Sequence, residues 1–207
     1  AWGMTEMSPM GTFNSPSADF DTLSSEEQWA QRLRVGRPVY GVEVKIVDAA
    51  GKELPWDGVS FGALKVRGPW ICAEYFRIGK GDAHDDEGWF ETGDVATIDR
   101  RGYVAITDRT KDVIKSGGEW ISSIDLENTA VAHPAVAEAA VIGAYHPRWD
   151  ERPLLCVVLH PGEQLTREDM LAWFEGKVAK WWVPDDVVFV DGLPHTATGK
   201  LSKKDLR

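Results

Sequence analysis

The chain has 207 residues, of which 43% are hydrophobic, and a formal net charge of −10 at pH 7. This length allows one large domain or two modest ones with packed cores, and the composition excludes wholesale disorder. The acidic charge argues against a general nucleic-acid or anionic-membrane binder. Cys72 and Cys156 lie in apolar surroundings, and no apolar run has the length of a membrane span. The sequence therefore predicts a cytoplasmic protein without a transmembrane segment.

The first residues carry three side chains suited to a nucleotide. Trp2 offers a ring that can stack on a flat base, Thr5 offers a hydroxyl for a phosphate, and Glu6 offers a carboxylate for a hard cation such as Mg²⁺. By itself this group is a weak signal, since many loops after a strand have a similar composition. Because no lead-in element precedes Trp2, we interpret the chain as beginning inside a domain of a longer protein.

Short strands separated by turn residues are predicted up to about Thr107. The expected elements are a helix over residues 25–33 and strands over residues 42–47, 61–66, 89–98 and 103–107. Arg100-Arg101-Gly102 joins the last two strands, which is typical of a hairpin. Several short strands of this kind indicate a small β-barrel or sheet layer.

A charged segment follows the hairpin and leads into a glycine pair. Arg109, Lys111 and Lys115 precede Gly117 and Gly118. A glycine pair beside clustered charge indicates a backbone that bends sharply or approaches a ligand closely. The other interpretation, a solvated turn between strands, is the one that composition alone favours.

The second half of the chain alternates strands and helices. Helices are expected over residues 123–133 and 166–178, and strands over residues 137–142, 154–159 and 187–190. The two longer strands read as buried on both faces. This order predicts a compact α+β unit. We place the domain boundary at residues 108–111, which gives domains of residues 1–108 and 109–207.

Lys200 lies in a Thr-Gly-Lys sequence within a flexible stretch near the end of the chain. A lysine on such a stretch presents a mobile positive charge suited to a phosphate or to developing negative charge. An exposed lysine in a tail is the alternative, and this stretch alone does not exclude it.

Taken together, these segments resemble the ordered motifs of adenylate-forming enzymes, the superfamily of acyl-CoA synthetases, peptide-synthetase adenylation domains and luciferases. The matching segments, in order, are Trp2-Gly3-Met4-Thr5-Glu6, Gly62-Ala63-Leu64, Arg67-Gly68-Pro69, Thr92-Gly93-Asp94, Asp108-Arg109-Thr110-Lys111, Ile114-Lys115, Gly118 and Thr198-Gly199-Lys200. Residues 118–128 and 146–153 look most like the fatty-acyl-CoA ligase branch, nearest its medium-chain type.

The resemblance implies a two-step reaction and a fold. A carboxylic acid would react with ATP and Mg²⁺ to give an acyl-adenylate, and CoA would then displace AMP to give a thioester. Residues 1–108 would be the end of a large adenylation domain with its β-barrel part, and residues 109–207 would be a small α+β domain that rotates between the steps.

The family's nucleotide contacts carry over to five positions. Trp2 matches the aromatic residue that packs on adenine, Thr5 matches a phosphate-contacting hydroxyl, and Glu6 matches the Mg²⁺-coordinating acid. Asp94 and Arg109 match the residues that contact the ribose.

Five further positions match residues of the small domain. Lys200 matches the catalytic lysine of adenylate formation, and Lys111 occupies the hinge position. Lys115, Gly117 and Gly118 lie on the loop that reaches the site for thioester formation.

The chain departs from the family pattern in two respects. Ala63 replaces the acid of the family's Gly-Glu-Leu motif, which puts one structural contact in doubt. The phosphate-binding loop and the acyl pocket lie upstream in this family and are not in this chain. We therefore expect a fragment that is inactive alone and needs the missing upstream part of its large domain.

Two other functions stay open at this point. The enzyme could load a carrier-protein phosphopantetheine instead of CoA, or the chain could be a non-catalytic interaction module that reuses the fold. The presence of Thr5, Glu6, Asp94, Arg109 and Lys200 together argues against the second.

Overall fold

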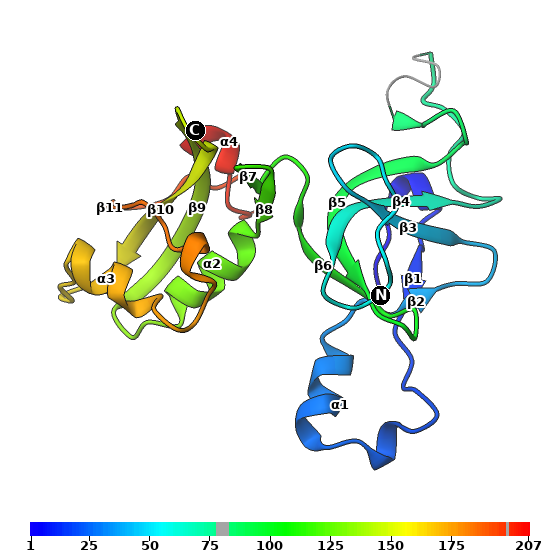
Figure 1. The fold of residues 1–207 in the computed structure, drawn as a ribbon, viewed down its shortest axis with the longest axis horizontal. Coiled ribbons are helices and arrows are strands. Elements are labelled where there is room, and N and C mark those ends of the chain that lie inside the picture. The colour runs from blue at the N-terminus through cyan, green and yellow to red at the C-terminus, as the bar shows by residue number, and fades with distance from the viewer. Residues whose placement is uncertain (78–82, 198) are drawn as a thin grey trace. The chain divides into compact units, whose positions relative to one another are not determined.

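The computed structural model describes residues 1–77, 83–197 and 199–207. The chain divides into two compact units, Ala1–Thr110 and Lys111–Arg207. Each unit has its own sheet and its own hydrophobic core (Figure 1). The chain is therefore a mixed α+β protein, as predicted.

The first unit is organised around a four-stranded antiparallel sheet in the order β3-β4-β5-β6. Its strands are β3 (Glu43–Val47), β4 (Phe61–Arg67), β5 (Phe90–Ile98) and β6 (Val104–Arg109), close to the predicted ranges. Of the two predicted arrangements, the sheet layer is confirmed and the barrel is not, because the sheet is open. Part of the reason is that the N-terminal segment covers the apolar face, where Met7 is fully buried in the core with Leu64 and Phe90.

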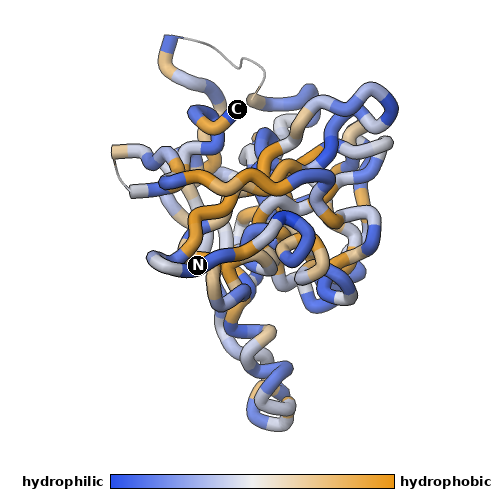
Figure 2. Tube along the Cα trace, turned by 90° about the vertical axis from the view of Figure 1, so that its left-hand side faces the viewer, coloured by the Kyte–Doolittle hydropathy of each residue, from blue (hydrophilic) through white to orange (hydrophobic). Residues whose placement is uncertain are grey.

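Two smaller elements complete this unit. The two-residue strands β1 (Thr12–Phe13) and β2 (Arg37–Pro38) pair antiparallel and were not predicted. Helix α1 (Ser25–Arg32) confirms the predicted helix, and Ser24 and Glu27 form a reciprocal capping box at its start. Figure 2 shows hydrophobic stretches in inner parts of the trace and hydrophilic residues at many of its outer turns.

The second unit has a five-stranded sheet with helices against it. Its elements are β7 (Ile114–Ser116), β8 (Glu119–Ile121), α2 (Ser123–Val131), β9 (Val136–His146), β10 (Asp150–Leu159), α3 (Arg167–Trp173), β11 (Asp186–Phe189) and α4 (Lys203–Leu206). Strands β9 and β10 form a long antiparallel hairpin, and β11 runs parallel to β10. The helices and strands predicted for this half of the chain are confirmed, apart from shifts at their ends.

Strands β9 and β10 are covered on both faces, as predicted. Leu155 and Val157 of β10 join the core formed with helices α2 and α3. Cys156, between them, faces the opposite side and packs with Ala140, Leu193 and partly buried residues of the C-terminal segment. Alternate residues of a strand point to opposite faces, so both layers are built from one apolar run.

The short elements β7, β8 and α4 were not predicted. Strands β7 and β8 have three residues each and pair across the glycine pair, where Gly117 and Gly118 have φ values of 60° and 88°. The glycines therefore form the turn of a hairpin, at backbone angles that residues with a Cβ rarely adopt.

Phe174→Ala should destabilise the second unit. Phe174 is fully buried between α3 and the sheet, so its truncation leaves a cavity and lowers the free energy of unfolding by about 3–5 kcal/mol. Tyr145→Ala, at a position that is 83% exposed in β9, is the matched control and should change it by less than about 0.5 kcal/mol. Urea denaturation, together with hydrogen exchange in β9 and β10, measures the stability of both variants. Equal destabilisation by the two substitutions would contradict the assigned core.

Candidate functional site

Asp94 is a buried carboxylate that accepts hydrogen bonds from two side chains of other elements. It lies on β5, its residue is 4% exposed, and its two oxygens accept from different side chains. The indole N–H of Trp2 donates to Oδ2 at 2.8 Å, and Nε of Arg109 lies 2.9 Å from Oδ1. The structure thus brings together three of the residues predicted to contact the nucleoside.

Local strand pairing positions this group. Asp94 and Arg109 are direct neighbours across β5 and β6, next to a bulge between Val95 and Ala96. The backbone N–H of Asp94 donates to the hydroxyl of Thr92 at 3.1 Å, and that hydroxyl donates to the Leu64 carbonyl at 2.8 Å. The carboxylate is therefore fixed from its own backbone as well as from its side chain.

Trp2 is held by the backbone on either side of it. Its N–H donates to the Thr12 carbonyl at 3.2 Å, and its carbonyl accepts from Gly11 at 3.0 Å. A Cβ on Gly11 would lie 2.7 Å from the Trp2 ring, so only glycine allows this close approach. Gly11 was not among the predicted site residues, and nothing in the local sequence indicates its contact with Trp2.

Thr5 and Glu6 lie on a short 3-10 turn, Thr5–Met7, that the buried Met7 anchors in the core. Thr5 is exposed and Glu6 is half-buried. The Glu6 carboxylate accepts from the Tyr75 hydroxyl at 2.9 Å, and its carbonyl accepts from the Cys72 N–H at 2.8 Å. Sequence reasoning missed both of these partners.

The Glu6 carboxylate fits the requirements of a magnesium ligand in part. Among the described residues, no group of three or more His, Cys, Asp or Glu side chains is arranged to hold a metal ion. Proteins usually bind Mg²⁺ through one or two carboxylates and leave the other positions to water and substrate phosphates. A half-exposed single carboxylate on an anchored turn suits that mode.

Ala63, at the position of the missing acid, lines a hollow beside the Asp94 site. The hollow has a volume of about 270 Å³, and Lys65, Glu91, Gly93 and Thr110 also line it. Lys65 pairs with Glu91 at 3.0 Å and with Asp85 at 3.1 Å. Burial alone would lower the pKa of Lys65, but these hydrogen bonds and charges outweigh it and raise that pKa.

In the second unit, the predicted thioester-step residues lie on the β7–β8 hairpin. Lys115 is exposed, and its backbone N–H donates to the Glu151 carboxylate at 2.9 Å. A Cβ on Gly117 would lie 2.9 Å from the Trp149 ring, whereas Gly118 has no heavy atom within 4 Å of that position. Gly117 is thus required by packing, and Gly118 only by its backbone angle.

A hollow of about 410 Å³ adjoins this hairpin. Gly117, Trp149, Trp181 and Arg152 are among the residues that line it. Arg152 holds one side together by donating to the Asp185 carboxylate at 2.8 Å and to the Trp181 carbonyl at 2.8 Å. In the sequence, residues 146–153 indicated only the ligase branch, and none of them was predicted to belong to a site.

The backbone of Lys200 is hydrogen-bonded to Thr196. Its N–H donates to the Thr196 hydroxyl at 3.2 Å, and its carbonyl accepts from the Thr196 N–H at 2.7 Å. Gly199 has a φ of 78°, and the Lys200 side chain is exposed. Thr198 of the predicted motif lies outside the described residues. Lys111, the predicted hinge residue, is exposed and is the first residue of the second unit.

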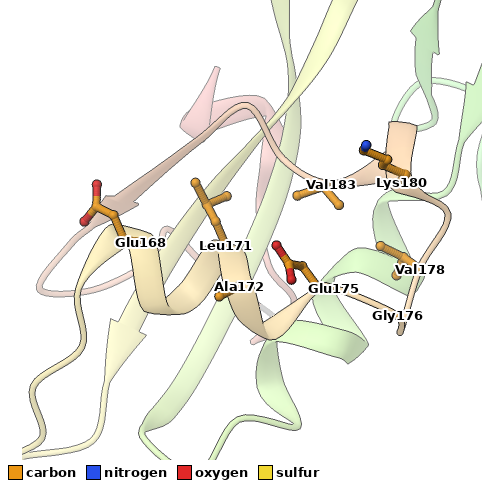
Figure 3. Close-up of a pocket in the computed structure, with 8 residues that line it drawn as sticks. All are labelled: Glu168, Leu171, Ala172, Glu175, Gly176, Val178, Lys180 and Val183. Atoms are coloured by element: carbon orange, nitrogen blue, oxygen red, sulfur yellow. The ribbon is translucent and has the colours of Figure 1, made fainter.

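A further hollow of about 810 Å³ lies between α3 and the segment that follows it (Figure 3). Leu171, Ala172, Val178 and Val183 give it an apolar lining, and Glu168, Glu175 and Lys180 contribute charged groups. No residue predicted to act in the reaction lines it.

Comparison with known proteins identifies the family. The family described as "AMP-binding enzyme" matches residues 1–76, and "AMP-binding enzyme C-terminal domain" matches residues 125–200. The chain belongs to the adenylate-forming AMP-binding enzymes. This confirms the predicted family, whose relatives include acyl-CoA ligases.

Several relatives match the whole chain. It is 58% identical to a 3-methylmercaptopropionyl-CoA ligase of Ruegeria lacuscaerulensis and 52% identical to a medium-chain-fatty-acid–CoA ligase of Ectopseudomonas oleovorans. In both cases the match covers 100% of this chain but 38% of the relative.

Solved structures agree with these relatives. ATP-bound MatB from Rhodopseudomonas palustris has 35% identity and a TM-score of 0.74, over 84% of this chain and 35% of that one. The o-succinylbenzoate CoA synthetase of Bacillus subtilis, in complex with its acyl-adenylate, has 30% identity and a TM-score of 0.79. That match covers 100% of this chain and 40% of the other. In the described ranges, none of the helices has the length and hydrophobicity needed to cross a membrane.

Glu6→Gln should lower the pKa of Tyr75. The hydrogen bond to the Glu6 carboxylate raises this pKa, followed by burial and the Glu6 charge, so removing the charge shifts it back toward its ordinary value. The stabilisation that this pair contributes is therefore present below the ordinary tyrosine pKa and is lost as pH rises through the raised value. Ultraviolet titration of phenolate measures the shift, and Tyr75→Phe identifies the titrating group. An unchanged titration curve in Glu6→Gln would contradict the contact.

Proposed function

We propose that the protein carrying this chain is an AMP-forming acid–CoA ligase. A carboxylate oxygen attacks the α-phosphorus of ATP, and the bond to pyrophosphate breaks to give an acyl-adenylate. The CoA thiolate then attacks the acyl carbon, and AMP leaves with the electron pair of the broken acyl–oxygen bond. Support comes from relatives that are 52–58% identical over the whole chain and are named CoA ligases.

The observation that carries the proposal is the direct contact between Trp2 and Asp94. Base and ribose are neighbours in a nucleotide, and here an aromatic ring and a buried carboxylate are neighbours joined by one hydrogen bond of 2.8 Å. A carboxylate has about four acceptor positions, so Asp94 keeps capacity for ribose hydroxyls beside its bonds to Trp2 and Arg109. The Trp2 ring, backed by Gly11, offers a flat surface to the base.

Phosphate chemistry is assigned to Thr5, Glu6 and Lys200. In this proposal the Thr5 hydroxyl donates to a phosphate oxygen, and Glu6 holds Mg²⁺, which when bound neutralises phosphate charge. The backbone of Lys200 is held by two hydrogen bonds to Thr196, and its ammonium supplies positive charge to the α-phosphate as pyrophosphate leaves.

In this proposal the second unit presents different residues to the site in each of the two steps. Residues 109–207 are the mobile domain in this proposal, residues 1–108 end the large adenylation domain, and Lys111 is the hinge. Rotation at one or two residues exchanges Lys200 for the hairpin that carries Lys115, Gly117 and Gly118 when CoA reacts. CoA is favoured over a carrier protein as acceptor because the relatives are named CoA ligases. Both cysteines are free thiols, which fits a cytoplasmic location.

The test uses the complete protein, including the segment upstream of this chain. AMP release is measured over a series of carboxylic acids that begins with 3-methylmercaptopropionate and medium-chain fatty acids, the acids in the names of the relatives. We expect AMP release that requires both an acid and CoA. Pyrophosphate exchange with an acid but no CoA-dependent AMP release would overturn CoA as the acceptor.

Lys200→Ala should separate the two steps. Loss of a positioned charge at the transition state should slow acyl-adenylate formation by roughly 100-fold or more, while thioester formation from supplied acyl-adenylate continues. Lys204→Ala removes the same charge from an exposed position in α4 and is the control. Pyrophosphate exchange and single-turnover thioester assays measure the steps, and equal loss of both contradicts the division of roles.

A further inference from the structure

The segment that carries Lys200 is attached to the rest of its unit by a largely buried ion pair. Nζ of Lys203 lies 2.7 Å from the Glu127 carboxylate and donates to the Ser123 hydroxyl at 2.6 Å. The two charged side chains are 10% and 16% exposed. The same Glu127 oxygen accepts the Val141 N–H at 2.8 Å, so this contact joins α4, α2 and β9. Ion pairs with this little exposure are screened much less than surface pairs.

The other end of α4 binds the residues at the predicted hinge. Nη2 of Arg207 donates to the Lys111 carbonyl at 3.1 Å and to the Asp112 carboxylate at 3.0 Å. The Asp112 side chain is 15% exposed. A guanidinium has several donors in one plane, so Arg207 can hold a backbone carbonyl and a carboxylate together.

Apolar contacts support both bonds. Leu201 and Leu206 pack on the face of the sheet where Ala140 and Cys156 are buried. Lys200 is therefore followed at once by a segment with buried apolar and charged contacts, and that segment ends on the backbone of Lys111.

We propose that Arg207 is a positioning residue that couples the hinge to the segment carrying the catalytic lysine, which Lys203 anchors to the body of the unit. The inference rests on the proposed roles of Lys111 and Lys200. Arg207 fixes the first residues of the second unit to the segment that bears Lys200, so that rotation carries both as one body. Without this contact, Lys111 and Asp112 move separately from the unit, and the pose for adenylate formation is less well defined.

The test measures the hinge and the reaction in the same variants of the complete protein. Arg207→Met removes the contact, and Lys204→Met removes a positive charge from an exposed site in the same helix. In Arg207→Met we expect faster hydrogen exchange at residues 111–113. We also expect the rate constant of adenylate formation to fall about tenfold with the KM for ATP unchanged, because misplacement costs rate and not ground-state binding. Lys204→Met should match the wild type in both measurements.

Further variants separate positioning from simple destabilisation. Asp112→Asn should reproduce part of the fall in rate and of the faster hydrogen exchange. The double variant Asp112→Asn/Arg207→Met should be no slower than Arg207→Met, because the two substitutions remove the same contact. Arg207→Lys keeps the charge without the planar fork and should fall between wild type and Arg207→Met. If Arg207→Met does not fold, Asp112→Asn and Arg207→Lys carry the test.

Two results would overturn the proposal. One is hydrogen exchange at residues 111–113 of Arg207→Met that is as slow as in the wild type. The other is an equal fall in the rate of adenylate formation in Lys204→Met. Failure of the proposed function gives a different result: no acid-dependent pyrophosphate exchange in the wild type, or no effect of Lys200→Ala. In that case the hydrogen-exchange measurement still tests the contact of Arg207 with the Lys111 carbonyl and the Asp112 carboxylate.

Discussion

The buried carboxylate of Asp94 is the constraint on which the first unit depends. A charge removed from water is strongly destabilising unless it is paired and hydrogen-bonded, and Asp94 is 4% exposed. Its partners come from both ends of the unit, Trp2 at the start and Arg109 at the end of β6. Satisfying this one group therefore fixes the entry of the N-terminal segment and the register of β5 with β6. The same requirement places an aromatic ring, a carboxylate and a guanidinium together, which is the arrangement that the proposed nucleoside site uses.

In the second unit the constraint is a hairpin that is apolar on both faces. Helices α2 and α3 cover one face of β9 and β10, and the second face would meet water unless another segment covered it. The C-terminal segment does so through Leu193, Leu201 and Leu206. Lys200 is thus an exposed residue within a segment whose neighbours are held by burial. The ammonium of Lys200 is thus exposed while the residues after it are anchored. Composition alone would describe this segment as a flexible tail.

Sequence patterns predicted the long elements well because each has a repeated signal. Residues 89–98 and 154–159 are rich in β-branched and apolar residues, and both are strands. Three-residue strands have no period to detect, so β7 and β8 were missed although the glycine pair between them was noted. The contact of Glu6 with Tyr75 joins residues 69 positions apart, and no local pattern indicates it. The sequence left the choice between a barrel and a sheet layer open, because alternation in a strand shows that a face is buried but not what covers it.

The motif positions and the contacts give complementary information about Trp2. By resemblance, the face of its indole ring is expected to pack on adenine. In the structure the edge of the same ring donates to Asp94, and Gly11 lies so close to the ring that no Cβ would fit. These uses do not compete, because a ring edge and a ring face are separate surfaces. An indole differs here from a phenyl ring, since its N–H can hold the carboxylate that the ribose would meet. The residue at this position therefore holds Asp94 and, in the proposed site, would also provide the stacking surface, so that a change from Trp would alter both together.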